Sequence, residues 1–394
     1  MSSPRKICVV TGSRADYGHL VPVMRAIDAS EDLTLQIIAC GEQLDPAFGE
    51  CWKEIVSDGF TINAKADIGL ESDTALATAE ATGRAVTALA QSLDNLMPDI
   101  VMVLGDRYEI FAACVAAMLL RIPIAHIHGG EVTEAAMDDA MRHAMTKMSA
   151  LHFVAAEPYA ARVRQMGEDP QNIIVCGAPG LDHLPDLKFQ SRTELSQQLD
   201  IELTEPLFVV TYHPVTLAGD YGAHAMSQLA TALDLFPNAS IIITGVNSDP
   251  GNKAIREIVA KICEDNPDKR TFAQSLGQRR YLSAVKIADA VIGNSSSGLI
   301  EAPALRTPTV NIGDRQKGRL RSPSVIDCGE SSKEIAEAIQ LAIEPSFKER
   351  VAVQSPAYGA GGGAAEKIVE VLASANLAQL SIKRFHDIIP APKL

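Results

Sequence analysis

The sequence lacks the long apolar runs that membrane-spanning and secreted chains carry. Its longest apolar run, residues 110–120, is far shorter than the ~20 residues that a membrane-spanning helix needs. Near the N-terminus, the apolar run 7–10 is also too short for a secretory signal sequence. We therefore expect a cytoplasmic protein with no membrane partner.

Paired cysteines are also missing. None of the seven cysteines belongs to a C-x-x-C motif, so neither a disulfide framework nor a zinc knuckle is expected. Cys8, Cys40, Cys176 and Cys328 lie in or beside apolar runs that are typical of strands. We expect their thiols to be buried and reduced.

Positive charge is in deficit. The chain has 35 Lys and Arg residues against 49 Asp and Glu residues, which gives a formal net charge of −14. This balance argues against a nucleic-acid partner, because such binding depends on a basic surface. An anionic ligand would need a local cationic pocket. The loop TGSRADYG (11–18) lacks both the G-x-G-x-x-G spacing and the Walker G-K-[ST], which argues against NAD and P-loop sites.

What the sequence does contain is a regular alternation of short β-branched apolar runs with longer helical patterns. The runs are 6–10, 35–40, 99–105, 122–127, 151–156 and 172–177, followed by 207–213, 240–245, 289–294, 307–313 and 324–328. This βαβ rhythm predicts parallel sheets with helices on both faces. Because the rhythm is lost over 180–206 and then restarts, we expect an α/β protein with two Rossmann-like, doubly wound domains that face a cleft.

The same pattern sets the expected domain boundaries. We place an N-terminal domain at 1–185 and a C-terminal domain at 186–370. The glycine-rich segment 359–365 predicts a turn into a last helix that runs through about Ala375. We expect the tail 371–394 to pack back on the N-terminal domain.

Polar and charged residues follow most of the predicted strands. In open α/β sheets, ligands bind beyond the carboxyl ends of the strands. The candidate segments are TGSRADYG (11–18), GDRYE (105–109), HIHGGE (126–131), YHPVT (212–216), TGVNSDPGN (244–252), GNSSSG (293–298) and GDRQKGR (313–319). We expect ionisable groups from both halves to meet in one cleft between the domains.

The segment GNSSSGLIEAP (293–303) combines hydroxyls, free backbone N–H groups and one carboxylate. A helix that begins near Ser297 would direct its first N–H groups, with the Ser295 and Ser296 hydroxyls, at a phosphate. Glu301 would then accept hydrogen bonds from the vicinal hydroxyls of a ribose. The alternative is purely structural: the serines cap a helix and Glu301 completes a capping box.

Two histidines and four carboxylates in the first half need separate weighing. His126 and His128 lie two apart, as metal ligands on a strand would, but no neighbouring His or Cys cluster supplies a third ligand, so no metal is expected. The carboxylates are Asp106, Glu131, Asp138 and Asp139. Apolar surroundings and mutual repulsion would raise the pKa of at least one of them, as acid–base chemistry requires. Helix capping is the alternative for one of the two adjacent aspartates.

Six motifs together resemble the hydrolysing UDP-N-acetylglucosamine 2-epimerases of sialic-acid biosynthesis. They are GSRADYGHL, LGDRYE, HIHGGEVTEAAMDDAMRHAMTKMS, YHPVT, GNSSSGLIEAP and NIGDRQKGR, and they cover nearly the whole chain in order. The resemblance implies the GT-B arrangement of two Rossmann domains, with UDP held largely by the second domain and the sugar facing the first.

Site residues follow from the same resemblance, position by position. The residues implied in substrate and UDP binding are Arg14, Arg107, His213, Asn247, Ser295, Ser296, Glu301 and Arg315. Among them, His213 meets the diphosphate, Asn247 the uridine region and Glu301 the ribose. Asp106 and Asp138 match catalytic carboxylates. The remaining candidates for acid–base chemistry are Glu131, His128 and His213.

The implied reaction converts UDP-N-acetylglucosamine and water to N-acetylmannosamine and UDP through a 2-acetamidoglucal, without metal or redox cofactor. One position departs from the animal enzymes, which have a glutamate where this chain has His128. The bacterial branch that reads H-I-H-G-G-E includes enzymes acting on UDP- or GDP-linked 2,4-diacetamido-2,4,6-trideoxy sugars of the legionaminic-acid pathway, which is the alternative substrate. A GT-B glycosyltransferase or a non-catalytic nucleotide-sugar sensor would share the nucleotide-binding half. We also expect a homo-oligomer, either a dimer or a tetramer.

Overall fold

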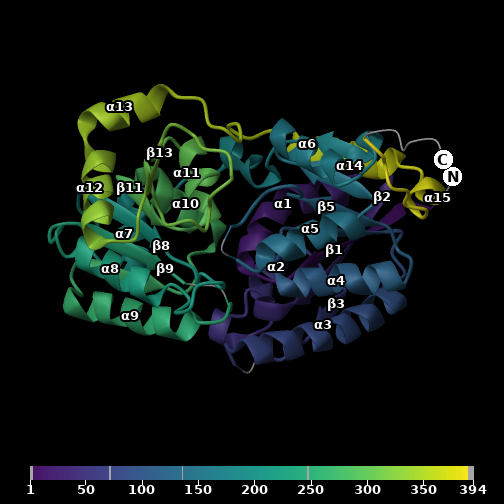
Figure 1. The fold of residues 1–394 in the computed structure, drawn as a ribbon, viewed down its shortest axis with the longest axis horizontal. Coiled ribbons are helices and arrows are strands. Elements are labelled where there is room, and N and C mark those ends of the chain that lie inside the picture. The colour runs from purple at the N-terminus through teal and green to yellow at the C-terminus, as the bar shows by residue number, and fades with distance from the viewer. Residues whose placement is uncertain (1–2, 71, 135, 246–247, 389–394) are drawn as a thin grey trace.

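In a computed structural model of the protein, which describes residues 3–70, 72–134, 136–245 and 248–388, the chain forms two parallel sheets that lie side by side (Figure 1). Seven strands within these residues form the first sheet, in the order β3-β2-β1-β4-β5-β6-β7. They are β1 (Arg5–Thr11), β2 (Leu33–Cys40), β3 (Ala64–Ala66), β4 (Ile100–Leu104), β5 (Ile124–Ile127), β6 (Leu151–Val154) and β7 (Ile173–Val175).

The second sheet repeats this arrangement. Its six strands in the described part of the chain have the order β10-β9-β8-β11-β12-β13. They are β8 (Leu207–Thr211), β9 (Ser240–Thr244), β10 (Arg270–Ala273), β11 (Ala290–Gly293), β12 (Thr309–Ile312) and β13 (Val325–Cys328). All pairs in both sheets are parallel, which confirms the predicted doubly wound α/β class.

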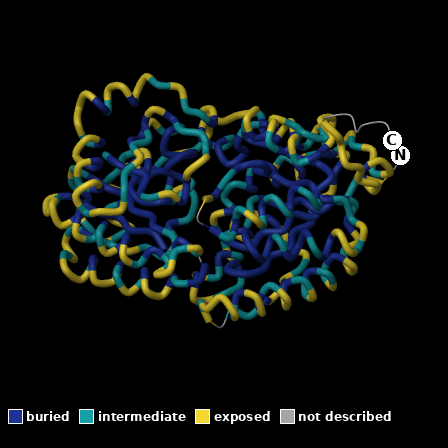
Figure 2. The backbone as a smooth tube through the Cα atoms, in the orientation of Figure 1, coloured by how far each residue is buried: buried dark blue, intermediate teal, exposed yellow. Residues whose placement is uncertain are grey.

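Helices cover both faces of each sheet. Over the first sheet, α3 (Ala75–Leu96), α4 (Tyr108–Leu119) and α5 (Asp138–Met148) lie on one face and α1 (Arg14–Asp28) on the other. Over the second, α8 (Ala223–Leu233), α9 (Asn252–Asp265) and α12 (Ser332–Ile343) lie on one face and α7 (Arg192–Leu199) and α10 (Gly277–Ile287) on the other. The strands are buried between these layers (Figure 2), which explains their continuous apolar character in the sequence.

The chain returns to the first sheet near its end. After α13 (Pro345–Val353), helix α14 (Ala364–Ser374) packs against α1, and its buried residues Ile368 and Leu372 join the core of the first sheet. Beyond the short α15 (Leu377–Leu380), the Lys383 ammonium donates hydrogen bonds to backbone carbonyls at the end of α5. Figure 1 shows this yellow C-terminal segment over the N-terminal half.

Two strands were not predicted from the sequence. β3 is only three residues long. β10 lies at an edge of the second sheet and is only partly buried. Neither strand therefore has an extended apolar run. The cysteine prediction is confirmed for the thiol state: all seven cysteines are unpaired, although Cys328 is only partly buried. Among the residues described, no helix is long and apolar enough to cross a membrane.

The strand order reverses once in each sheet, between β1 and β4 and between β8 and β11. At such a point the chains leave two neighbouring strands in opposite directions and open a crevice at their carboxyl ends. The loops that follow β1, β4, β8 and β11 carry four of the motifs singled out in the sequence. These crevices are therefore the first places to look for a site.

Candidate active site

One cleft between the two sheets contains most of the predicted site residues, in two adjoining pockets. The outer pocket is lined by Arg14, Gln278, Tyr281 and Glu301, among others. The inner pocket is lined by a mainly charged set: Asp106, Arg107, His128, Glu131, Asp138, Arg142, Arg315 and Arg319. Both pockets share Ala15, His19, His213, Ser295 and Ser296, so they form one continuous space.

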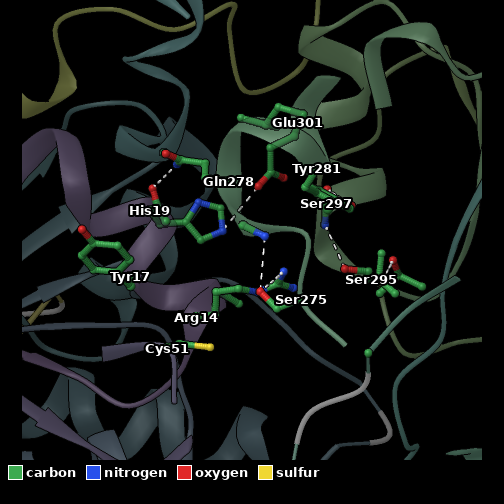
Figure 3. A pocket seen from close by; sticks show the side chains of 18 of the residues that line it. Arg14, Tyr17, His19, Cys51, Ser275, Gln278, Tyr281, Ser295, Ser297 and Glu301 are labelled. Carbon is green, nitrogen blue, oxygen red and sulfur yellow. Dashed lines mark hydrogen bonds and ion pairs between the residues drawn. The ribbon is translucent and has the colours of Figure 1, made fainter. Parts of the chain in front are cut away.

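The outer pocket brings together polar groups from both halves of the chain (Figure 3). Arg14, at the start of α1, donates from Nη1 to the Ser275 hydroxyl at 3.0 Å. On the opposite wall the Tyr281 hydroxyl donates to Ser297 Oγ at 2.6 Å. Arg14 thus places a positive charge in the pocket while it also joins the two halves.

Glu301 lies at the start of α11 (Glu301–Ala304) and reaches into the outer pocket. Its Oε1 lies 3.5 Å from His19 Nε2, and its buried Oε2 has no hydrogen-bonding partner in the described part of the chain. A buried carboxylate oxygen without a donor is costly unless a ligand supplies one. Glu301 is therefore suited to accept hydrogen bonds from hydroxyl groups.

The serine turn differs from the regular helix that the sequence analysis predicted. Ser296–Gly298 form a single 3₁₀ turn, which Ser295 caps by accepting from the Ser297 N–H. At its start, a Cβ on Gly293 (φ 136°) would lie 1.9 Å from the Thr211 carbonyl oxygen, so glycine permits the close approach of β11 to β8. Ser295 and Ser296 nevertheless line both pockets, as their predicted role requires.

His213 lies with the serines where the pockets meet, and Arg315, which lines the inner pocket, contacts the residue before Ser295. Burial, aided by the charges of Arg315, Arg107 and Arg14, lowers the pKa of His213 well below its usual value, so its ring is neutral. Its Nδ1 is buried without a partner. Arg315 donates from Nη1 to the Asn294 carbonyl at 3.3 Å, while its Nε has no partner. This junction can therefore offer several donors to an anion.

The inner pocket holds two aspartates in opposite electrostatic environments. Burial alone would raise the pKa of Asp106, but Arg142, Arg319 and Arg315 together lower it below its usual value. Asp106 is hydrogen-bonded through Oδ2 to the Arg142 guanidinium and to Thr133 Oγ1. It is a fixed anion.

Asp138, at the first position of α5, is the opposite case. Burial raises its pKa to about 7, and repulsion from Asp106 and Asp249 adds to the effect. Its Oδ2 is buried and unpartnered. Near neutral pH this carboxyl can hold a proton or release it, as an acid–base catalyst must.

Glu131 and His128 form a close pair beside the aspartates. His128 Nδ1 lies 2.6 Å from Glu131 Oε1. Although burial favours the neutral form of Glu131, its contact with His128 and the positive charge of Arg319 lower its pKa to about 2, so it stays ionised. Asp139, by contrast, accepts a hydrogen bond from the Thr133 N–H at 2.8 Å and lies 3.6 Å from His143, so it fixes the loop before α5, whose first turn has no side-chain cap.

Arg107 has a different environment from the one predicted. Its guanidinium already pairs with Glu109 (2.6 Å), Glu42 (2.8 Å) and, across the cleft, Asp249 (3.3 Å). It also donates to the Ser248 hydroxyl at 2.9 Å. These partners neutralise its charge, so Arg107 joins the two halves of the chain rather than offering a free cation.

Of the two remaining residues from the sequence analysis, only His126 can be placed. His126 is buried, with Nε2 at 2.8 Å from the Gly105 carbonyl, so it supports the sheet and does not act with His128. Asn247 lies outside the described residues. In the part of the chain that the structure describes, no group of three or more His, Cys, Asp or Glu side chains is arranged to hold a metal ion.

Sequence reasoning missed three residues that shape the cleft: His19, Arg142 and Arg319. Arg142 follows Asp138 by four positions, so both lie on one face of α5, a spacing that could have revealed it. His19 and Arg319 both lie inside motifs already noted, one helical turn or a short loop beyond the residues chosen there. Their importance follows from contacts across the fold, which no local pattern shows.

Comparison with known proteins places this chain in a family. The family model described as UDP-N-acetylglucosamine 2-epimerase matches residues 25–373. A Campylobacter jejuni relative named GDP/UDP-N,N'-diacetylbacillosamine 2-epimerase (hydrolyzing) is 40% identical over 325 residues, covering 82% of this chain and 84% of that protein. The Legionella pneumophila UDP-N,N'-diacetylbacillosamine 2-epimerase (hydrolyzing) is 35% identical over 358 residues, covering 91% and 93%.

A solved structure agrees at the level of the fold. The crystal structure of UDP-GlcNAc 2-epimerase from Neisseria meningitidis bound to UDP-GlcNAc superposes with a TM-score of 0.78 at 20% identity, covering 93% of this chain and 99% of the other. The resemblance drawn from the six motifs is confirmed by these matches. The chain is an enzyme that belongs to the UDP-N-acetylglucosamine 2-epimerase family.

Proposed function

We propose that this protein is a hydrolysing 2-epimerase of a UDP-linked 2-acetamido sugar, which releases UDP and the free sugar inverted at C2. The observation that carries the proposal is the pair of inner-pocket aspartates, Asp106 held as an anion and Asp138 with a pKa near 7. Environments that push the pKa values of two neighbouring carboxyls apart are typical of acid–base sites. The Campylobacter and Legionella relatives are both named as hydrolysing 2-epimerases.

The nucleotide fits the outer pocket in this proposal. The free Oε2 of Glu301 accepts hydrogen bonds from the ribose hydroxyls. The diphosphate occupies the junction, where Ser295, Ser296 and His213 supply donors and Arg315 supplies another from the inner pocket. A neutral His213 can donate to a phosphate oxygen without adding a charge that must be desolvated.

The sugar then enters the inner pocket. As the bond between C1 and the diphosphate breaks, positive charge develops at C1, and the Asp106 anion stabilises it. Loss of the C2 proton completes the 2-acetamidoglucal. Protonated Asp138 returns a proton to C2 from the other face, water adds at C1, and the free sugar leaves with inverted C2.

For the sugar itself we propose UDP-N,N'-diacetylbacillosamine as the preferred substrate. The two relatives named for this sugar are 40% and 35% identical to the chain, whereas a Neisseria meningitidis serogroup B protein named UDP-N-acetylglucosamine 2-epimerase is 31% identical over 342 residues. UDP-N-acetylglucosamine, the first expectation from the sequence, is the second candidate. Both share the C2 acetamido group that the mechanism uses.

Turnover in heavy water tests reaction and substrate together. With UDP-N,N'-diacetylbacillosamine we expect release of UDP and a free sugar that carries one deuterium at C2, because the proton returned to C2 comes from a group that exchanges with solvent. We expect kcat/KM at least about tenfold higher than with UDP-N-acetylglucosamine, about 1.4 kcal/mol of discrimination. Nuclear magnetic resonance of the product detects the deuterium at C2, and the rate at which product appears with each substrate gives the two kcat/KM values. Product with only protium at C2 would rule out the elimination–addition route.

The nucleotide assignment predicts the effect of Glu301→Ala. Loss of the carboxylate should weaken UDP binding by about 1–3 kcal/mol, the scale of charge-assisted hydrogen bonds. Glu337→Ala is the matched control, since Glu337 is exposed on α12 of the same half and, among the described residues, forms an ion pair only with Lys333, at 3.9 Å. Titration calorimetry with UDP should separate the two variants, and equal affinities would refute the ribose assignment.

The acid assignment predicts the effects of Asp138→Asn. Because asparagine cannot give up a proton, kcat should fall by about 10²-fold or more with UDP affinity nearly unchanged. In the unsubstituted enzyme, kcat/KM should fall as pH rises through about 7, where Asp138 ionises. Asp139→Asn keeps an acceptor for the Thr133 N–H and should retain activity within a few-fold.

Stability gives an independent check on Asp138. Its folded-state pKa is raised, so between its unfolded value and about 7 the folded protein holds a proton that the unfolded chain has lost. The contribution of Asp138 to stability therefore falls as pH rises through this window. The melting temperature of Asp138→Asn minus that of the unsubstituted protein should therefore be larger at pH 8 than at pH 5. A difference that does not change with pH would contradict the raised pKa.

A further inference from the structure

His128 is held in an unusual conformation at the end of β5. Its φ of 63° lies in the left-handed region, which residues other than glycine rarely occupy. Two backbone contacts hold it there: its N–H donates to the Phe153 carbonyl at 3.0 Å, and its carbonyl accepts from Arg142 Nη1 at 2.9 Å. Backbone strain kept in place by several contacts is common at functional sites.

The contact with Glu131 fixes which ring nitrogen carries the proton. Glu131 is ionised and buried, and its other oxygen faces Arg319 Nη1 at 3.5 Å. Because a carboxylate only accepts hydrogen bonds, His128 Nδ1 must donate across the 2.6 Å contact. In the neutral ring Nε2 therefore carries the lone pair.

That lone pair has no partner among the residues that the structure describes. His128 Nε2 is buried and unbonded, and the residue lines the inner pocket together with Asp106 and Asp138. A histidine held by a carboxylate through one nitrogen, with the other free in a pocket, is the arrangement of a general base.

The chemistry needs such a base in addition to Asp138. Inversion at C2 removes a proton from one face of the sugar and returns one to the opposite face, so two groups are required if the sugar stays in place. With a pKa raised to about 7, Asp138 is partly protonated near neutral pH, and its buried, unpartnered Oδ2 is suited to give a proton to the sugar. The acceptor for the first proton must come from elsewhere in the pocket.

We propose that His128 is the base that removes the C2 proton, and that Glu131 positions its ring. The assignment rests on the proposed function and adds to it. In the step, the C2–H bond breaks and its proton moves to Nε2, while its electron pair forms the C1–C2 double bond. The C1–O bond breaks and its pair leaves with UDP, so charge and atoms balance. His128 then loses its proton to solvent.

The chain contains a second buried His–Glu pair that serves as a matched control. His152 Nε2 lies 3.0 Å from Glu168 Oε2, but His152 lines neither pocket, and Glu168 also binds Lys147 and Lys383. Substitution of His152 should therefore affect stability only. Because this pair has no access to the cleft, the His152 variant shows how far loss of a buried His–Glu contact lowers activity through stability alone.

The test separates the two half-reactions. Elimination is followed as UDP release from the nucleotide sugar, and hydration is followed by supplying the 2-acetamidoglucal of the same sugar with UDP present. The main variant is His128→Asn, because asparagine tolerates the left-handed conformation and its amide can donate to Glu131. His128→Gln, Glu131→Gln, Asp138→Asn and His152→Gln are run beside it, each with UDP affinity measured by calorimetry.

We expect His128→Asn to slow elimination by about 10³-fold while hydration stays within about tenfold of the unsubstituted enzyme. Glu131→Gln should slow elimination by about 10–100-fold, again with little effect on hydration. Asp138→Asn should slow hydration, and His152→Gln should slow neither.

Distinct results overturn distinct claims. Elimination that stays near normal in either His128 variant, or an equal loss of both half-reactions in variants that still bind UDP, would overturn the assignment of His128. If the unsubstituted enzyme released no UDP from either candidate nucleotide sugar, the proposed function itself would fail.

Discussion

The site depends above all on one buried guanidinium, that of Arg142. From α5 it binds Asp106 in the loop after β4 and Thr133 and the His128 carbonyl in the segment after β5. Helix α5 and the segments after β4 and β5 are thus held together around one charge. Because Arg142 keeps Asp106 ionised, Asp106 repels a second negative charge and helps to raise the pKa of Asp138. This ion pair therefore contributes to the protonation states of two carboxyls, together with burial, which is the largest cause of the raised pKa of Asp138.

The two halves of the chain also contribute jointly to this electrostatic arrangement. Asp249 follows β9 in the second half, yet its charge is among the causes that raise the pKa of Asp138 in the first. Arg107 holds Asp249 and Ser248 against the first half. Its Nη1 lies 3.3 Å from Asp249 Oδ1, and its Nη2 lies 2.9 Å from the Ser248 hydroxyl. Contact between the halves and the acidity of Asp138 are thus physically linked.

Most of the strands and several residues of the cleft could be predicted from the sequence, because they follow from the spacing of the apolar runs and from the positions of polar residues after those runs. Continuous β-branched runs predicted eleven of the strands, and the rule that ligands bind at the carboxyl ends of strands pointed to Asp106, Asp138 and Glu301. The edge strands β3 and β10 were missed because short or half-exposed strands lack such runs. The environment of Arg107 was also out of reach, since two of its partners lie more than 140 residues away along the chain. Likewise, only the fold shows that His128, and not His126, presents a free nitrogen to the pocket.

The central claim is that burial and neighbouring charges move the pKa values of Asp106 and Asp138 in opposite directions. Carbon-13 labelling of the aspartate carboxyls, with Asp138→Asn to assign the signal, would measure both by nuclear magnetic resonance in the UDP-free protein. The account predicts that Asp138 titrates with a pKa of about 7, while the pKa of Asp106 lies below the usual value for an aspartate. Ordinary titration of both groups near pH 4 would contradict it.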